Sequence, residues 1–285
     1  MERVPVDGGE LAVGVWGDGG PLVVAAHGIT SHHLSWGLVG PDLAADHRFV
    51  AVDLRGRGRS RDLPGPYGMA RHAADLAAVV KAYGGTATVV GHSMGCWAAI
   101  ALARTHPMLV ERLVLVDGGP PLDPPPGVPA EPTEEQVREA ITATVGQAYA
   151  RLSMTFPDRE AYRAMWRAHP SFAEWTDAMT AYADYDLVEV DGALRPACRL
   201  EAALRDARDL YAWHPVKPEP LPVPAVFLRA ERGMLNQEEP FFRPGAAARA
   251  FPGVEERDVA GVNHYTITLS PRGARVVADA VRGLR

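Results

Sequence analysis

A serine between two glycines is the first candidate for chemistry in this chain. Residues 91–95 read Gly-His-Ser-Met-Gly, so Ser93 fits the pattern G-x-S-x-G. An apolar run, Ala87–Gly91, precedes the motif, and a helical pattern, Met94–His106, follows it. The turn from strand into helix is so sharp that glycines are needed where the chain segments approach, and the serine hydroxyl is lifted above the sheet edge. Ser93 is therefore predicted to be a nucleophile.

A serine hydroxyl is a poor nucleophile without a general base. The chain contains ten histidines, and His264 is the predicted base because it follows a predicted strand near the C-terminus. The others lie inside the serine motif, directly after an early strand, or in loops and helices without a motif. The pair His32-His33 has no acidic or cysteine neighbours, so it predicts no metal site.

The bulk composition excludes several classes of function. With 22% charged residues and a net charge of -6, the chain is an ordinary globular protein without a basic stripe, so no nucleic-acid partner is expected. The N-terminus does not resemble a secretory signal, and the apolar runs are too short to span a bilayer. Two cysteines without a C-x-x-C spacing predict no disulfide framework. We expect a soluble, cytoplasmic protein that acts on a small molecule.

The elements that position these residues alternate along the chain. Early apolar, β-branched runs end at turn residues, as strands do. A helical pattern at Met69–Tyr83 stops at two glycines and is followed by the strand before Ser93. Such alternation predicts an α/β fold with a mostly parallel sheet covered by helices. The predicted strands are Glu10–Trp16, Leu22–His27, Arg48–Asp53, Ala87–Gly91, Arg112–Asp117, Ala225–Arg229 and Glu255–Val259, and a last helix spans Pro271–Leu284.

An insertion interrupts this alternation. Seven prolines between residues 120 and 132 form a stiff linker, and a capping box, Thr133 to Gln136, then starts a helical pattern that runs to about Trp213. We predict a core made of residues 1–119 and 220–285 and a helical lid at 120–219. The lid is rich in aromatic and methionine side chains, which predicts lid packing and an apolar pocket above Ser93. Pocket candidates are Met154, Trp166 and Trp213.

Four motifs in order resemble the α/β-hydrolase superfamily over nearly the whole chain. His27-Gly28 resembles its HG oxyanion loop, residues 53–60 (Asp-Leu-Arg-Gly-Arg-Gly-Arg-Ser) resemble its D-x-R-G-x-G-x-S loop, and Asn263-His264-Tyr265 resembles its late histidine loop. The resemblance implies an eight-stranded sheet with helices on both faces and an inserted lid. It also implies an oxyanion hole made by the backbone N–H groups of Ile29 and Met94. No metal or organic cofactor is implied.

The acid that orients His264 has more than one candidate. In most relatives it follows the strand before the histidine strand, but that position falls on Gly233, and Glu231 lies two residues earlier. In certain haloalkane dehalogenases and zearalenone-type lactonases, which this sequence resembles in this respect, the acid follows the strand after the nucleophile helix. That position is Asp117. Asp117 is the preferred acid and Glu231 the alternative; Asp258 and Glu238 also stay open.

The leading hypothesis is hydrolysis of a carboxylic ester or lactone with a hydrophobic body through an acyl-enzyme. Epoxide hydrolase and dehalogenase chemistry is disfavoured because those enzymes attack with a carboxylate. C–C bond hydrolysis and perhydrolysis would use the same residues and stay open. A slow-turnover ligand receptor on the same fold is the alternative from another class. The sequence predicts neither the acyl group nor the oligomeric state.

Overall fold

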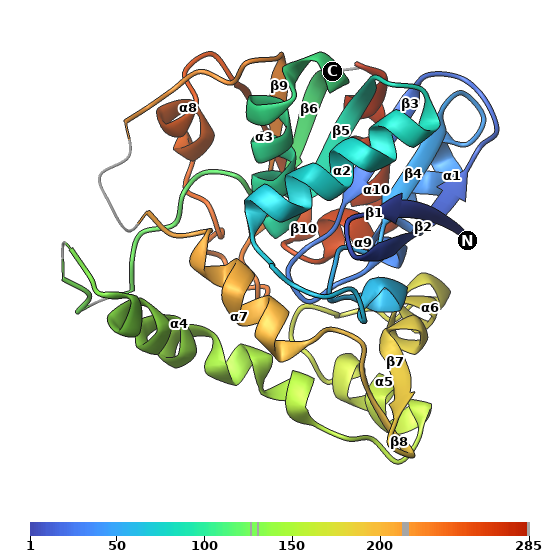
Figure 1. Ribbon diagram of the computed structural model, residues 1–285, viewed down its shortest axis with the longest axis vertical. Helices are drawn as coiled ribbons and strands as arrows, with labels where there is room; N and C mark the ends of the chain where they lie inside the picture. Colours follow the sequence, from blue (N-terminus) through green and yellow to red (C-terminus); the bar gives the residue numbers. More distant parts are fainter. Residues whose placement is uncertain (126, 130, 213–216, 284–285) are drawn as a thin grey trace.

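A twisted eight-stranded sheet forms the centre of the protein (Figure 1). The computed structural model describes residues 1–125, 127–129, 131–212 and 217–283. The strand order is β1-β2-β4-β3-β5-β6-β9-β10. Neighbouring strands from β4 to β10 are parallel, whereas β1 and β2 pair in antiparallel fashion. This confirms the predicted mostly parallel sheet. The strands are β1 (Glu2–Val6), β2 (Gly9–Trp16), β3 (Leu22–Ala26), β4 (Arg48–Val52), β5 (Ala87–His92), β6 (Val110–Val116), β9 (Ala225–Arg232) and β10 (Glu255–Asn263).

Helices cover both faces of the sheet (Figure 1). One face packs against α2 (Met69–Tyr83), α3 (Met94–Thr105) and α8 (Ala246–Ala250). The other packs against α1 (Val39–Leu43), α9 (Thr266–Leu269) and α10 (Pro271–Arg282). Among the described residues, no helix is long and apolar enough to cross a membrane. Short 3-10 turns complete the core: η1 (His33–Trp36), η2 (Gly58–Ser60) and η3 (Pro107–Leu109).

The apolar runs form central strands because each must bury both of its faces. In β5, Val89 packs into the cluster under α2 and α3, and its neighbour Val90 packs into the cluster under α10. Successive side chains of a strand point to opposite faces, so a strand covered on both sides is continuously apolar. Strand β5 therefore lies in the middle of the sheet, and its carboxyl end carries Ser93.

The inserted residues form helices and one small hairpin. The predicted capping box is confirmed, because the Thr133 N–H donates to Gln136 Oε1 at 2.9 Å and the Gln136 N–H donates to Thr133 Oγ1 at 3.3 Å. The structure differs from the all-helical expectation at a hairpin whose turn is Asp191-Gly192, both with positive φ. Asp-Gly between alternating residues is a hairpin signal that the helical interpretation overlooked. The elements are α4 (Glu134–Tyr149), η4 (Ala150–Ser153), α5 (Arg159–Arg167), α6 (Asp177–Asp186), β7 (Leu187–Val190), β8 (Ala193–Pro196) and α7 (Leu200–Arg208).

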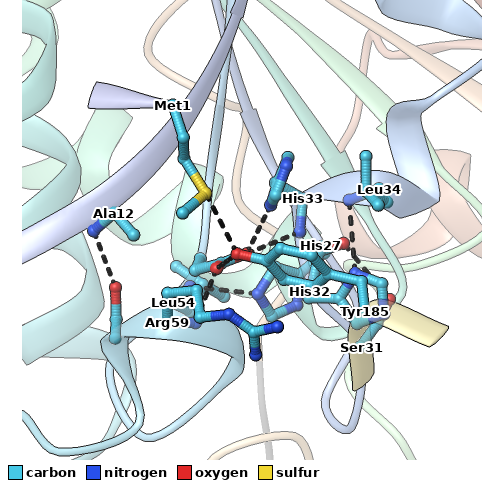
Figure 2. Close-up of polar contacts among 12 residues, drawn as sticks. Met1, Ala12, His27, Ser31, His32, His33, Leu34, Leu54, Arg59 and Tyr185 are labelled. Carbon is cyan, nitrogen blue, oxygen red and sulfur yellow. Dashed lines mark hydrogen bonds and ion pairs between the residues drawn. The ribbon is translucent and has the colours of Figure 1, made fainter. Parts of the chain in front are cut away.

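Helix α6 is joined to the core through Tyr185. Its hydroxyl donates to Asp53 Oδ2 at 2.6 Å. Its ring lies edge-on to His33, and the guanidinium carbon of Arg59 lies 4.2 Å from the ring centroid (Figure 2). The Asp53 carboxylate also accepts hydrogen bonds from the His33 backbone and ring and from the Arg59 N–H. The insertion thus packs on the side of the sheet where the serine motif lies. The division into core and lid at residues 119 and 220 stays a prediction.

Candidate active site

Ser93 occupies the turn between β5 and α3 in strained backbone. Its φ of 51° and ψ of -127° lie in a region that residues with a side chain rarely adopt. A Cβ on Gly95 would lie 2.1 Å from the Ala26 carbonyl oxygen, and one on Gly91 would lie 2.5 Å from the backbone nitrogen of Cys96. Neither contact leaves room for a larger residue. The turn therefore depends on glycine, as the sequence motif predicted.

The structure brings His264 and Asp117 together. Asp117 directly follows β6, His264 directly follows β10, and His264 Nδ1 lies 2.7 Å from Asp117 Oδ2 with both side chains buried. The backbone N–H of Ala230 donates to the other carboxylate oxygen at 3.1 Å. Asp117 has a φ of 47°, so strain occurs here as well as at Ser93. Because a carboxylate only accepts, His264 Nδ1 carries the proton, and Nε2 is left as the basic nitrogen.

The other candidate acids have different partners. Glu231 is exposed, and its carboxylate accepts a backbone N–H of β10 at 2.6 Å. At Gly233 a Cβ would lie 2.1 Å from a neighbouring glutamine side chain, so this position has no space for an acid. Asp258 pairs with an arginine of β9 at 2.7 Å, and Glu238 is exposed. Asp117 is the acid that the structure places against His264.

The two residues expected to form the oxyanion hole adjoin the serine: Ile29 lines the same cavity as Ser93, and Met94 follows Ser93 in the chain. Met94 is the first residue of α3, so its N–H has no carbonyl partner in a preceding helical turn. The Ile29 N–H belongs to the peptide whose carbonyl is on Gly28, and that carbonyl lies 2.7 Å from His27 Nδ1. His27 Nε2 accepts the Leu54 N–H at 3.0 Å, which places the ring proton on Nδ1. Burial lowers the pKa of His27 to about 3, so the ring is neutral and the peptide is held in one orientation.

His92 connects the serine turn to the histidine loop. Its Nε2 donates to the His264 carbonyl oxygen at 2.8 Å, and the two rings lie 4.9 Å apart. Burial, together with the neighbouring His264, lowers the pKa of His92 to about 3. The loop is also closed by Asn263, whose Oδ1 accepts the N–H groups of Tyr265 and Thr266 at 3.0 and 2.9 Å. The neutral His92 therefore has a positioning role for the backbone of His264.

Ser93 and His264 line one small cavity of about 50 Å³. The same cavity is lined by Tyr182 of α6, whose hydroxyl donates to Ser31 Oγ at 3.1 Å, and by Leu269 and Tyr265. Sequence reasoning missed these lining residues. Tyr265 could have been predicted from the sequence, because it belongs to the Asn-His-Tyr motif. Tyr182 carries no local signal, because only the packing of α6 brings it to the cavity.

Two of the predicted pocket residues, Met154 and Trp166, are not among the residues that line this cavity. Met154 is 45% exposed after η4. Trp166 is buried in a cluster of lid side chains, where it contacts Phe172 and Tyr182. Trp213 lies outside the described residues. The insertion's aromatic side chains pack mainly on one another, because mutual burial removes more apolar surface from water than lining a small cavity. Within the described ranges, no group of three or more acidic, histidine or cysteine side chains could hold a metal ion.

The fold and this site together define an α/β hydrolase. The sequence model of the alpha/beta hydrolase family matches residues 23–280. The chain belongs to that family, which confirms the resemblance seen in the four motifs.

Two relatives cover most of the chain. The chain is similar to a 2-(acetamidomethylene)succinate hydrolase of Mesorhizobium japonicum, with 28% identity over 93% of this chain and 90% of the relative. It is also similar to an N-formylmaleamate deformylase of Pseudomonas putida, with 31% identity over 72% of this chain and 80% of the relative. The crystal structure of an E-2-(acetamidomethylene)succinate hydrolase superposes with a TM-score of 0.76 at 27% identity, covering 99% of this chain and 97% of that one. The protein is thus a hydrolase of the α/β-hydrolase family.

Proposed function

We propose that the protein is a serine hydrolase that transfers a short acyl group to water through an acyl-enzyme on Ser93. The observation that carries the proposal is the buried 2.7 Å contact between His264 Nδ1 and Asp117 Oδ2, next to a strained serine that lines the same cavity as His264. This combination of nucleophile, base and orienting acid is the arrangement that nucleophilic catalysis requires.

The first step is attack of Ser93 Oγ on the carbonyl carbon of the substrate. His264 Nε2 accepts the hydroxyl proton and then gives it to the leaving group, so the acyl group becomes bound to Ser93. Water then attacks the acyl-enzyme while His264 Nε2 accepts a proton from it. His264 gives that proton to Ser93 Oγ as the acyl–oxygen bond breaks, so the acid product leaves and the serine hydroxyl is restored. Asp117 keeps the proton of the neutral ring on Nδ1 and stabilises the imidazolium that forms in each step.

The negative oxygen that develops in both steps needs hydrogen-bond donors. The N–H groups of Ile29 and Met94 supply them in this proposal, and the positive end of α3 adds favourable charge. Removal of one such donor costs about 10²–10³ in kcat in other hydrolases.

The volume of the cavity favours a short acyl group. Pockets that enclose drug-sized ligands measure about 300–1,000 Å³, whereas this one measures about 50 Å³. That space suits a formyl or acetyl group of a few heavy atoms. In this proposal residues 120–219 act as the lid, and Tyr182 is the lid side chain that limits acyl length. The hydrophobic body expected from the sequence would then belong to the leaving group.

The bond that is cleaved has two candidates. A carboxylic ester or lactone is the bond expected from the sequence. An N-acyl bond is the second candidate, because the names of the two relatives carry an acetamido group and an N-formyl group. An open-chain ester and an N-acyl compound both present a small acyl group to the serine, whereas a lactone would leave its whole opened ring on Ser93. The same residues serve all three bonds. Cleavage of a C–C bond on this site stays a prediction.

Turnover of p-nitrophenyl formate, acetate, butyrate and hexanoate by wild type and by Ser93→Ala tests the proposal. N-formylmaleamate and 2-(acetamidomethylene)succinate form the N-acyl arm of the same panel. We expect steady turnover of the one- and two-carbon esters, little of the hexanoate, and none by the variant. Preference for an N-acyl compound over every ester would select the second candidate. Labelling of Ser93 by a fluorophosphonate without turnover of any compound would favour the receptor alternative. The absence of both labelling and turnover would refute the serine-hydrolase proposal.

A further inference from the structure

A buried arginine contacts both residues to which the proposed function assigns the oxyanion hole. The Arg57 side chain is fully buried, and its Nε donates to the Ile29 carbonyl oxygen at 2.9 Å. Its Nη2 lies 4.0 Å from Met94 Sδ, and its Nη1 donates to the Arg55 carbonyl oxygen at 2.9 Å. The guanidinium thus fixes the chain on the carboxyl side of Ile29, while His27 fixes the peptide on the amino side. The oxyanion loop is held at both ends.

The insertion supplies the counter-charge for this arginine. Asp206 of α7 lies 2.5 Å from Arg57 Nη1 and 2.8 Å from His72 Nε2 of α2, with all three side chains buried. Burial alone would raise the pKa of the Asp206 carboxyl, yet the neighbouring His72 and Arg57 hold it below its usual range. The carboxylate therefore stays charged and keeps the guanidinium in place. The ion pair between Arg57 and Asp206 therefore links α7 to the oxyanion loop.

We propose that Arg57 is a positioning residue for the oxyanion hole, and that Asp206 of the insertion's last helix holds it in the active arrangement. The proposal rests on the proposed function, because it needs Ile29 and Met94 to bind the developing oxyanion. It adds that α7 is part of the catalytic apparatus without touching the substrate. The oxyanion hole reaches its working geometry only when α7 is docked.

A second ion pair in the same loop provides a matched control. Arg55 pairs with Asp75 of α2 through two contacts of 2.9 Å, and both side chains are buried to the same degree as Arg57 and Asp206. The remaining donors of Arg55 reach the carbonyl oxygens of Pro64 and Asp7, away from the serine. Loss of the Arg55–Asp75 pair removes the same two charges as loss of the Arg57–Asp206 pair. It leaves the hydrogen bond from Arg57 Nε to the Ile29 carbonyl oxygen intact.

The test compares the double variants Arg57→Met/Asp206→Leu and Arg55→Met/Asp75→Leu. Removing both partners avoids an unpaired buried guanidinium or carboxylate, and apolar replacements of similar volume are often tolerated. His72 also loses its acceptor, and Tm records the cost of that loss. The readouts are kcat and KM on p-nitrophenyl acetate, the rate of Ser93 labelling by a fluorophosphonate, and Tm. Phosphonylation also builds negative charge on an oxygen, so labelling reports the oxyanion hole without the natural substrate.

We expect the Arg57/Asp206 variant to lose about 10- to 100-fold in kcat and in labelling rate per folded molecule, less than the cost of deleting a donor outright. KM should change less than threefold, and the pH profile should keep its midpoint, because His264 and Asp117 are untouched. The Arg55/Asp75 variant should label at close to the wild-type rate, whatever its Tm.

The single variant Arg57→Lys decides the question if the double variant does not fold. It keeps a charge opposite Asp206 but lacks the Nε donor that reaches the Ile29 carbonyl oxygen, so its labelling should be slowed. Wild-type labelling by Arg57→Lys would overturn the proposal, as would an equal loss in the Arg55/Asp75 control. If wild type itself is not labelled, the failure lies in the proposed function and not in the role of Arg57.

Discussion

Replacing Asp117 by asparagine is the most informative change at the proposed site. The asparagine would keep the size of the side chain and could still accept the Ala230 N–H. Its amide nitrogen would then face His264 Nδ1, which is 2.7 Å from Asp117 Oδ2 in the wild type. An amide N–H needs an acceptor, so His264 would carry its proton on Nε2 instead of Nδ1.

That tautomer cannot accept the Ser93 proton. The same exchange lowers kcat by about 10⁴ in a serine protease, which is about 5 kcal/mol of transition-state stabilisation at about 1.4 kcal/mol per tenfold. We expect a loss of similar size here because Asp117 is fully buried and water cannot replace its carboxylate. KM should change little, because Asp117 does not line the cavity.

The assay is steady-state turnover of p-nitrophenyl acetate, with Glu231→Gln as the control. The Glu231 carboxylate is exposed and accepts a backbone N–H that a glutamine oxygen can also accept. The control should therefore keep wild-type kcat. A crippled Glu231→Gln together with an active Asp117→Asn would refute the assignment of Asp117 as the orienting acid.

The remaining predictions concern the serine turn, the cavity and acid stability. Gly28→Ala should fold but label slowly with a fluorophosphonate, because its Cβ would lie 3.3 Å from Ser93 Cβ. Gly95→Ala should lower Tm sharply, because its Cβ would lie 2.1 Å from a backbone oxygen. Equal Tm values for the two variants would contradict this prediction. Leu269→Ala should raise the ratio of butyrate to acetate turnover by enlarging the cavity, at a stability cost of about 2–5 kcal/mol; an unchanged ratio would place the acyl group elsewhere. Burial lowers the pKa values of three histidines, so below about pH 6.5 the unfolded chain binds protons that the folded protein does not bind. The free energy of unfolding should therefore fall by up to about 1.4 kcal/mol per pH unit per histidine as the pH drops from 6.5 toward 4. Denaturant titrations at several pH values measure that slope, and a flat profile would contradict the lowered values, which are about 3 for His27, about 4 for His32 and about 3 for His92.

The sequence predicts the serine turn well because its signal is local. Strand, glycines, serine and helix are contiguous from Ala87 to Thr105, and each is required by the geometry of the next. The parallel sheet is predictable for a similar reason, since continuous apolar runs form strands that are covered on both faces.

The orienting acid and the cavity depend on contacts distant in sequence. Asp117 and His264 are 147 residues apart, and only the order β6-β9-β10 brings the two strand ends to the same edge. Sequence reasoning therefore left Glu231 open. Tyr182 lines the cavity because α6 docks on the core, and no local pattern encodes that docking. The hairpin at Asp191-Gly192 was missed because its strands are four residues long inside a helical background.

In the proposed mechanism Ser93 carries the acyl group between two chemical steps. Rapid mixing of wild type with p-nitrophenyl acetate, followed by acid quench and peptide mass analysis, detects that intermediate. We expect a burst of p-nitrophenol approaching one equivalent, with one acetyl group on the peptide that contains Ser93, and neither in Ser93→Ala. Turnover without acetylation of Ser93, or equal turnover by Ser93→Ala, would contradict it.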